Sequence, residues 1–144
     1  MGRGNLLESL KKESKTRDLD NILFFNEIDS EEIPTLYKQC HAGIISLDQR
    51  HKTHNIPGKF LSYMQAGLPV LAVINSGNEL ERIINDNGVG RVTTNHSVEH
   101  LVSLVEEIIG SMMDNESVKE KCKSLYNDYY SPKKTVEQII DSFA

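Results

Sequence analysis

The sequence lacks long apolar runs and an excess of basic residues. No window approaches the roughly 18 to 20 consecutive apolar residues of a membrane-spanning helix. The start, Met1-Gly2-Arg3-Gly4-Asn5, has no apolar core of a signal peptide. The 16 Lys and Arg residues are outnumbered by 21 Asp and Glu, so a net charge of −5 gives no global positive field for nucleic acid or anionic lipid. We therefore expect a cytoplasmic protein with no nucleic-acid partner, in which any phosphate site is local.

Cysteine is scarce, and the sequence contains no familiar metal-ligand spacing. The two cysteines, Cys40 and Cys122, lie far apart in the sequence, which fits reduced thiols better than a secreted disulfide framework. We expect Cys40 to be a small core residue and Cys122 a partly buried helix residue. His51 and His54 form a His-x-x-His pair without a third or fourth ligand nearby, so we predict no metal and no cofactor.

What the sequence does contain is an alternation of helix and strand patterns. With 144 residues the chain is long enough for one buried core and too short for two ordinary domains, so we expect a single domain over residues 1–144. Apolar runs predict strands at 22–25, 43–47, 69–74 and 90–94, the first buried on both faces and the last at an edge. Helical patterns occupy residues 5–17, 30–40, 57–67 and 78–87, and three closing helices occupy 97–144. This order predicts an α/β fold, a Rossmann-like parallel sheet covered by helices on both faces.

The loop from Asp48 to Ile56 is cationic within an acidic protein. Ligands of open parallel sheets bind beyond the carboxyl ends of the strands, where this loop is expected. The loop leads into a helix beginning at Pro57-Gly58, whose first N–H groups, near Gly58, Lys59 and Phe60, we expect to be unpaired donors. Lys59 adds a positive charge, and Gly58 lets a ligand approach the backbone. The pattern favours an anion site; the alternative is that Pro57-Gly58 is only a turn and Lys59 a solvated side chain.

Other polar residues near these loops carry weaker signals. Asp48 and Glu79 could form an acid/base pair across neighbouring loops, but carboxylates near helix starts are more often caps, and we assign neither to catalysis. Ser62 has no Gly-x-Ser-x-Gly elbow around it, so we do not expect a hydrolase nucleophile.

Several segments together resemble a known family. The run from Ile56 to Val73, with its helix-Ala-Gly-x-Pro-Val-strand core, looks like the nucleotide-sugar-binding segment of group 1 (family 4) glycosyltransferases. In that family the segment belongs to the C-terminal domain of a GT-B fold. Gly2 to Leu6 resembles the family's Gly-x-Gly-Pro turn, and Asn21 to Ile28 resembles its strand carrying Asn-Val-x-Phe-x-Gly. Leu36 to Ile45 is similar to the stretch that usually ends Ala-Asp-Val, and the closing helices agree in kind.

The resemblance implies a donor-binding domain, truncated at its N-terminal side by two strands. Its activity would be transfer of a sugar from a nucleoside-diphosphate sugar, with UDP expected, to a glycan or lipid-linked acceptor in polysaccharide biosynthesis. A missing N-terminal domain would hold the acceptor and make any membrane contact, so the 144-residue piece would be inactive alone. Sheet edges exposed by the missing strands would either pair directly or join a second copy in a homodimer.

The resemblance also implies roles for individual residues. The donor diphosphate would be held by Asn55, Ile56, Pro57, Gly58 and Lys59, and the base by the backbone around Glu27 and Ile28. His54 would contact the sugar hydroxyls or the leaving phosphate, and Ser62 the ribose. Many members carry glutamates at the positions of His54 and Ser62, whereas the Pro-Gly-Lys spelling resembles the bacterial surface-polysaccharide subgroup. The expected catalytic residues are His54 and Lys59, because helix donors and Lys59 would stabilise the departing diphosphate without metal.

Two other functions remain open on the sequence alone. One is a sugar-nucleotide epimerase fragment, although the acid/base residues that such an enzyme needs are not evident. The other is a non-catalytic Rossmann-like module that binds a partner protein through the loop from Asp48 to Asn55. Nucleotide binding at Lys59 is expected of a transferase and not of a partner-binding module.

Overall fold

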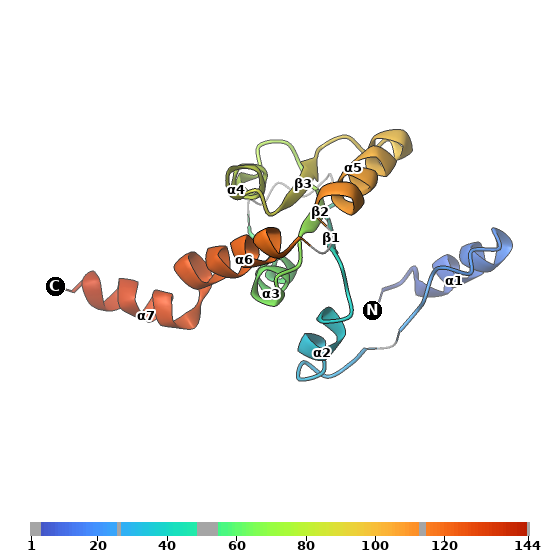
Figure 1. The fold of residues 1–144 in the computed structure, drawn as a ribbon. Helices are drawn as coiled ribbons and strands as arrows, with labels where there is room; N and C mark the ends of the chain where they lie inside the picture. Colours follow the sequence, from blue (N-terminus) through green and yellow to red (C-terminus); the bar gives the residue numbers. More distant parts are fainter. Residues whose placement is uncertain (1–3, 26, 49–54, 113–114, 144) are drawn as a thin grey trace. The chain divides into compact units, whose positions relative to one another are not determined.

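The computed structural model describes residues 4–25, 27–48, 55–112 and 115–143. It divides into two compact units, Met1–Leu36 and Tyr37–Ala144, which are described separately. The first unit contains helix α1 and the segment after it. The second contains a parallel sheet with its helices (Figure 1).

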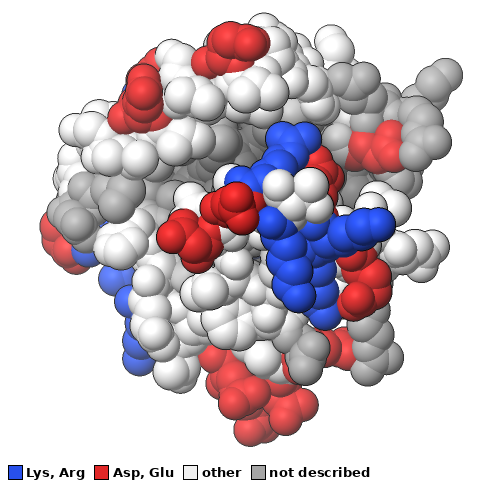
Figure 2. All heavy atoms as spheres, turned by 90° about the vertical axis from the view of Figure 1, so that its right-hand side faces the viewer, with Lys and Arg blue, Asp and Glu red and all other residues white. Residues whose placement is uncertain are grey.

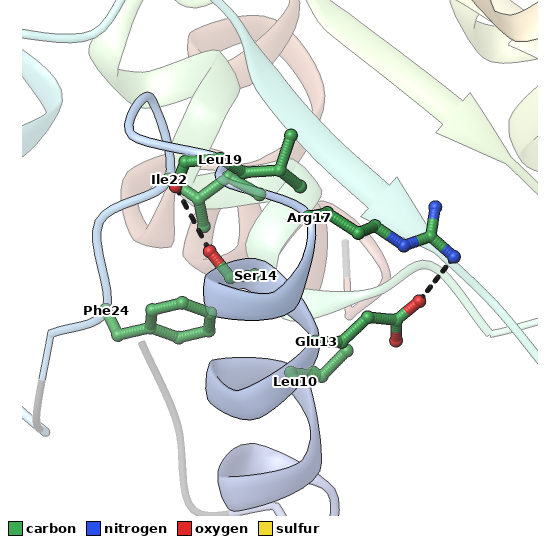
Figure 3. Close-up of a pocket in the computed structure, with 7 residues that line it drawn as sticks. All are labelled: Leu10, Glu13, Ser14, Arg17, Leu19, Ile22 and Phe24. Atoms are coloured by element: carbon green, nitrogen blue, oxygen red, sulfur yellow. Dashed lines mark hydrogen bonds and ion pairs between the residues drawn. The ribbon is translucent and has the colours of Figure 1, made fainter.

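Helix α1 (Leu7–Thr16) and the segment that follows it form the first unit. Figure 3 shows Leu19, Ile22 and Phe24 beside α1, where they line a cavity of about 350 Å³. The Ser14 hydroxyl donates to the Leu19 carbonyl at 3.2 Å, which closes the turn after the helix. At the rim, Arg17 pairs with Glu13 at 2.6 Å. The expected surface helix at 5–17 is therefore confirmed.

The strand predicted at residues 22–25 does not form. Ile22, Leu23, Phe24 and Phe25 are 43%, 73%, 37% and 50% exposed, and none of them is in a strand. A four-residue apolar run becomes a strand only where neighbouring strands supply ladder hydrogen bonds and other elements cover its faces. The prediction of a strand buried on both faces was wrong because no such neighbour pairs with this run in the described part of the chain.

The next helix is shorter than the pattern indicated. α2 (Ile33–Tyr37) begins after a turn in which the Glu32 N–H donates to the Asp29 carbonyl at 3.0 Å. We expected a helix over 30–40 with Ser30 as its N-cap. Pro34 explains the difference, because a proline ring is compatible only with the first turn of a helix. The helix therefore starts next to Pro34 rather than at Ser30.

Three parallel strands form the sheet of the second unit, in the order β1-β2-β3. They are β1 (Gly43–Ser46), β2 (Val70–Val73) and β3 (Gly90–Thr93). The register aligns Gly43 with Val70 and Val70 with Gly90. All four residues of β2 are buried, as expected for a central strand, while β1 alternates buried and exposed residues. Three of the four predicted strands are thus confirmed, with β3 at an edge.

Helices lie on both faces of this sheet. α3 (Gly58–Ala66) and α4 (Glu79–Asn87) are the two crossover helices, which right-handed connections place on one face. α5 (Val98–Ser111) packs on β2 and β3 from the opposite face (Figure 1). α6 (Glu116–Leu125) packs against α3 and α4, continues as a π-helical turn η1 (Tyr126–Tyr130), and precedes α7 (Pro132–Asp141). The α/β fold class, a Rossmann-like parallel sheet flanked by helices, is confirmed.

The helix ends follow from local sequence. α3 and α4 each stop at a glycine in the left-handed conformation, Gly67 at φ 76° and Gly88 at φ 61°. Polar side chains cap the starts of four helices by accepting a backbone N–H: Asn78, Ser97, Asn115 and Ser131. These signals explain why the helix boundaries after residue 57 lie close to the predicted ones.

The two cysteines exchange the roles that we expected. Cys122 lies on the inner face of α6 and is 0% exposed, whereas Cys40, between α2 and β1, is only half-buried. The core is formed mainly by β2 and the inner faces of α3 and α4, which meet α6 at Cys122. A residue in a connecting turn has less protein around it than one on a helix packed against two others, so Cys40 lies at the margin of the core.

On the face drawn in Figure 2, most of the visible Lys and Arg side chains gather in one group. Lys and Arg side chains are bordered by Asp and Glu on the face drawn in Figure 2. On α1, for example, Lys11 pairs with Glu8 at 3.0 Å.

No helix in the described ranges is both long enough and apolar enough to cross a bilayer.

Candidate functional site

The start of α3 is an uncapped helix N-terminus on the carboxyl side of the sheet. β1 ends at Ser46, and the described chain resumes at Asn55 before entering the helix at Pro57. Pro57 occupies the N-cap position with φ −64° and ψ 136° and makes no side-chain cap. Proline cannot offer such a cap, so first-turn N–H groups of α3 are left for a ligand.

One of the three expected donors is already used. The Phe60 N–H donates to the Pro57 carbonyl at 2.9 Å, so the expectation that it is unpaired was wrong. The N-cap carbonyl reaches this amide because the first turn is tight, with an i to i+3 hydrogen bond. The remaining first-turn donors are the N–H groups of Gly58 and Lys59.

Gly58 and Lys59 combine open space with positive charge. A Cβ built on Gly58 has no atom within 4 Å, so the backbone is approachable there. Lys59 is exposed and forms no ion pair with any residue that the structure describes. The helix dipole disfavours a cation in a first turn, and an anion bound here would interact favourably with both the dipole and the Lys59 ammonium.

Ser62 and the residues before Pro57 complete this end of the helix. The Ser62 hydroxyl donates to the Gly58 carbonyl at 3.2 Å, one turn earlier on the same face of α3. Its oxygen keeps lone pairs that can accept from a ligand hydroxyl. Ile56 is half-buried against the core, and Asn55 is exposed. The structure thus brings together six of the predicted binding residues: Asn55, Ile56, Pro57, Gly58, Lys59 and Ser62.

Three predicted site residues are not among these six: Glu27, Ile28 and His54. His54 falls outside the described residues, as do Arg50, His51 and Lys52 of the same loop. Glu27 is exposed and Ile28 half-buried; both belong to the first compact unit, and α3 belongs to the second. Their roles therefore stay predictions.

The loop after β2 ends at a buried asparagine that sequence reasoning missed. Asn78 is the N-cap of α4 and is 3% exposed; its Oδ1 accepts from the Leu80 N–H at 3.0 Å. Its buried Nδ2 has no hydrogen-bond partner among the described residues. An unsatisfied buried donor is unfavourable by about 1–3 kcal/mol. The signal was present in the sequence, because asparagine before an acidic first turn is a typical N-cap.

The described side chains offer no cluster for a metal ion. No group of three or more His, Cys, Asp or Glu residues converges within residues 4–25, 27–48, 55–112 and 115–143. What the site offers chemically is backbone donors, one lysine and one hydroxyl, a set suited to an anionic group attached to a polyol.

Comparisons with known proteins bear on this arrangement. The sequence model of the family described as "Glycosyl transferases group 1" matches residues 1–125. The chain is also similar to a protein named "Probable glycosyltransferase WbjE" from Pseudomonas aeruginosa, with 25% identity over 139 residues. That alignment covers 96% of this chain and 34% of the relative, so the chain spans about a third of the relative's length. No solved structure matches the chain. Because the family match covers most of its residues, the chain belongs to the group 1 glycosyltransferases.

Proposed function

We propose that this chain is the donor-binding part of a glycosyltransferase that uses a nucleoside-diphosphate sugar, with UDP as the nucleotide. The acceptor in this proposal is a glycan or lipid-linked glycan of polysaccharide biosynthesis, held mainly by a separate N-terminal domain. Family membership supports sugar transfer. The observation that carries the donor assignment is the uncapped start of α3, with an approachable backbone at Gly58 and an exposed Lys59.

The proposed chemistry follows from where charge develops. The bond between the anomeric carbon and the diphosphate oxygen breaks, and the bonding electrons remain on the departing diphosphate. An acceptor hydroxyl forms the new bond to the anomeric carbon and releases its proton. The N–H groups of Gly58 and Lys59 and the Lys59 ammonium would stabilise the growing negative charge, which lowers the barrier without a metal. His54 is assigned to the sugar hydroxyls or the leaving phosphate, and Ser62 to the ribose.

The base is assigned to the backbone around Glu27 and Ile28, which belongs to the first unit. Because the chain spans about a third of the relative's length, we assign acceptor binding to another part of the protein and expect the 144-residue chain to bind donor without completing transfer. Association of two copies through β1 is part of the same proposal.

A titration followed by backbone amide NMR tests the donor site. UDP, GDP and several UDP-sugars are added to the 144-residue chain and to its Lys59→Ala variant. We expect UDP to shift the amides of Gly58, Lys59 and Ser62, and Lys59→Ala to weaken binding about tenfold, because a charge-assisted contact to phosphate is lost.

Lys133→Ala is the matched control. Lys133 is also an exposed lysine in the first turn of a helix that begins with proline, but the side chain of Ser131 caps that helix. UDP binding should be unchanged in this control. Binding that is insensitive to Lys59→Ala would place the diphosphate elsewhere, and the absence of any nucleotide effect would favour the partner-binding module. Interconversion of UDP-sugars without an acceptor would instead favour the epimerase.

A further inference from the structure

A second cavity lies between α4 and the π-helical turn η1. Its volume is about 460 Å³, within the range of about 300–1,000 Å³ typical of small-molecule sites. Glu79, Arg82 and Asp86 of α4 line one wall, and Tyr129 and Tyr130 of η1 line the other. All of these residues are in the second compact unit. We call this cavity the α4–η1 groove.

The groove adjoins the proposed donor site at Ile56. Glu79, Arg82 and Asp86 recur at the spacing of one helix face and span about 10 Å at 1.5 Å per residue. Ile56, which directly precedes Pro57 at the start of α3, also lines the groove. A ligand in the groove would therefore lie next to the place where we locate the donor diphosphate.

The aromatic wall is held in place by the core. Tyr130 packs edge-on against Phe60 of α3, with ring centroids 6.5 Å apart and an interplanar angle of 84°. Phe60 itself is 0% exposed. Tyr129, by contrast, is 62% exposed and lies 6.3 Å from the Tyr130 ring. The groove thus has one anchored tyrosine and one whose ring is available to a ligand.

The Tyr130 hydroxyl is protonated at neutral pH, and burial is the main reason. Burial raises the pKa of Tyr130, the charge of Glu79 and the neighbouring Tyr129 raise it further, and Arg82 opposes them. The phenol therefore remains a hydrogen-bond donor and acceptor at neutral pH. Glu79 and Arg82 line the same cavity as Tyr130.

This combination matches the chemistry of a sugar ring. A pyranose presents hydroxyls around its rim and apolar C–H groups on its faces. Carboxylates such as Glu79 and Asp86 accept hydrogen bonds from hydroxyls, the Arg82 guanidinium donates to them, and a tyrosine face covers the C–H groups. Two carboxylates against one guanidinium would repel a phosphorylated ligand, which makes an uncharged polyol the better fit.

We propose that the α4–η1 groove is a saccharide-binding subsite that holds one or two sugar residues of the acceptor glycan. The assignment of that saccharide to the acceptor rests on the proposed glycosyltransferase function. The groove would fix the acceptor chain close to the donor site and so add to whatever the N-terminal domain contributes.

Neutral tetrasaccharides provide a direct test. N-acetylchitotetraose, cellotetraose and maltotetraose are titrated separately into the 144-residue chain with ¹³C-labelled Ile and Leu methyl groups. We expect at least one of them to give saturable shifts at Ile56, Ile83 and Leu125, which line the groove. Tyr129→Ala should weaken that binding by about fivefold to tenfold, because the exposed stacking surface is lost.

Two comparisons make the test decisive. Phe143→Ala removes another exposed aromatic ring, 86% exposed and outside the groove, and should leave saccharide binding unchanged. Adding UDP to the same samples measures binding at Gly58 and Lys59 separately from saccharide binding. Saccharide shifts without UDP shifts would support the groove and count against the donor site. UDP shifts without saccharide shifts, or saccharide binding unaffected by Tyr129→Ala, would overturn the groove alone.

Discussion

Cys122 lies on the inner face of α6, where its thiol is 0% exposed among apolar side chains. Burial raises the pKa of Cys122 from an ordinary value of 9.0 to about 12. Desolvation explains the direction, because removing the thiolate from water destabilises the charged form. The buried thiol is therefore protonated throughout the physiological range and is a poor nucleophile.

This shift predicts a loss of stability in alkali. The unfolded chain releases the Cys122 proton near pH 9, whereas the folded chain retains it up to about pH 12. Retention of this proton therefore contributes to the free energy of unfolding, and the contribution is complete below pH 9. Between pH 9 and pH 12 the free energy of unfolding falls, by at most about 1.4 kcal/mol per pH unit. Urea unfolding at several pH values should show this slope, and Cys122→Ala should make it shallower. An equal slope in both proteins would contradict the assignment.

At the scale of one element, β3 depends on a residue without a side chain. A Cβ on Gly90 would overlap the carbonyl oxygen of Val70 in the adjacent central strand. Backbone in the middle of a sheet cannot move aside as a flexible side chain can. Gly90 is therefore needed for close approach of β3 to β2.

Gly90→Ala should lower the free energy of unfolding by about 3 kcal/mol, because the two strands must separate to make room. Gly110→Ala in α5 is the control, since a Cβ there has no atom within 4 Å. Inside a helix this change should raise stability by about 0.5–1 kcal/mol. Both are measured by urea unfolding followed by circular dichroism. Equal effects of the two substitutions would contradict the strand contact.

The elements that could be predicted from sequence are those with local start and stop signals. α3 and α4 end at Gly67 and Gly88, and caps such as Ser97 and Ser131 mark later helices. The run at 22–25 carried no comparable information, because its strand character depends on partners elsewhere in the fold. A short apolar run indicates only that the segment is suited to a sheet.

In the candidate site, too, features that depend on neighbouring residues were predictable and features that depend on distant packing were not. The start of α3 was predictable, because Pro57, Gly58 and Lys59 are consecutive and their chemistry is local. The α4–η1 groove was not, since it depends on the packing of a π-helical turn against a helix far away in the sequence. The sequence predicted the helix at 78–87, but Tyr130 opposite it is positioned by its contact with Phe60.

For the whole molecule, the most informative feature is uncovered apolar surface in the second unit. Ile44 in the edge strand β1 is 63% exposed. On α5, four residues at helical spacing form an outward stripe: Val98, Val102, Val105 and Ile109, which are 69%, 50%, 39% and 55% exposed. An edge strand that carries an exposed isoleucine is a surface suited to association.

We expect the chain to form a dimer through β1. Sedimentation velocity over a range of concentrations should show a monomer–dimer equilibrium, and Ile44→Lys should shift it to monomer because a charge on an edge strand opposes pairing. Ile139→Lys is the control, since Ile139 is 52% exposed on α7, away from the sheet. A single monomeric species of the unmodified chain at all concentrations would rule out this dimer.

The strand order of the sheet also bears on how the chain folds. β1, β2 and β3 are adjacent in the order in which a ribosome makes them, and each pairing closes a loop that contains one helix. Gly43 pairs with Val70 and Val70 with Gly90, so each pairing closes a loop of moderate length, and the chain-entropy cost of a loop rises only slowly with its length. The sheet can therefore grow during synthesis from β1 outward, before α5 emerges to cover β2 and β3. Its assembly would be sequential, with each strand serving as the template for the next.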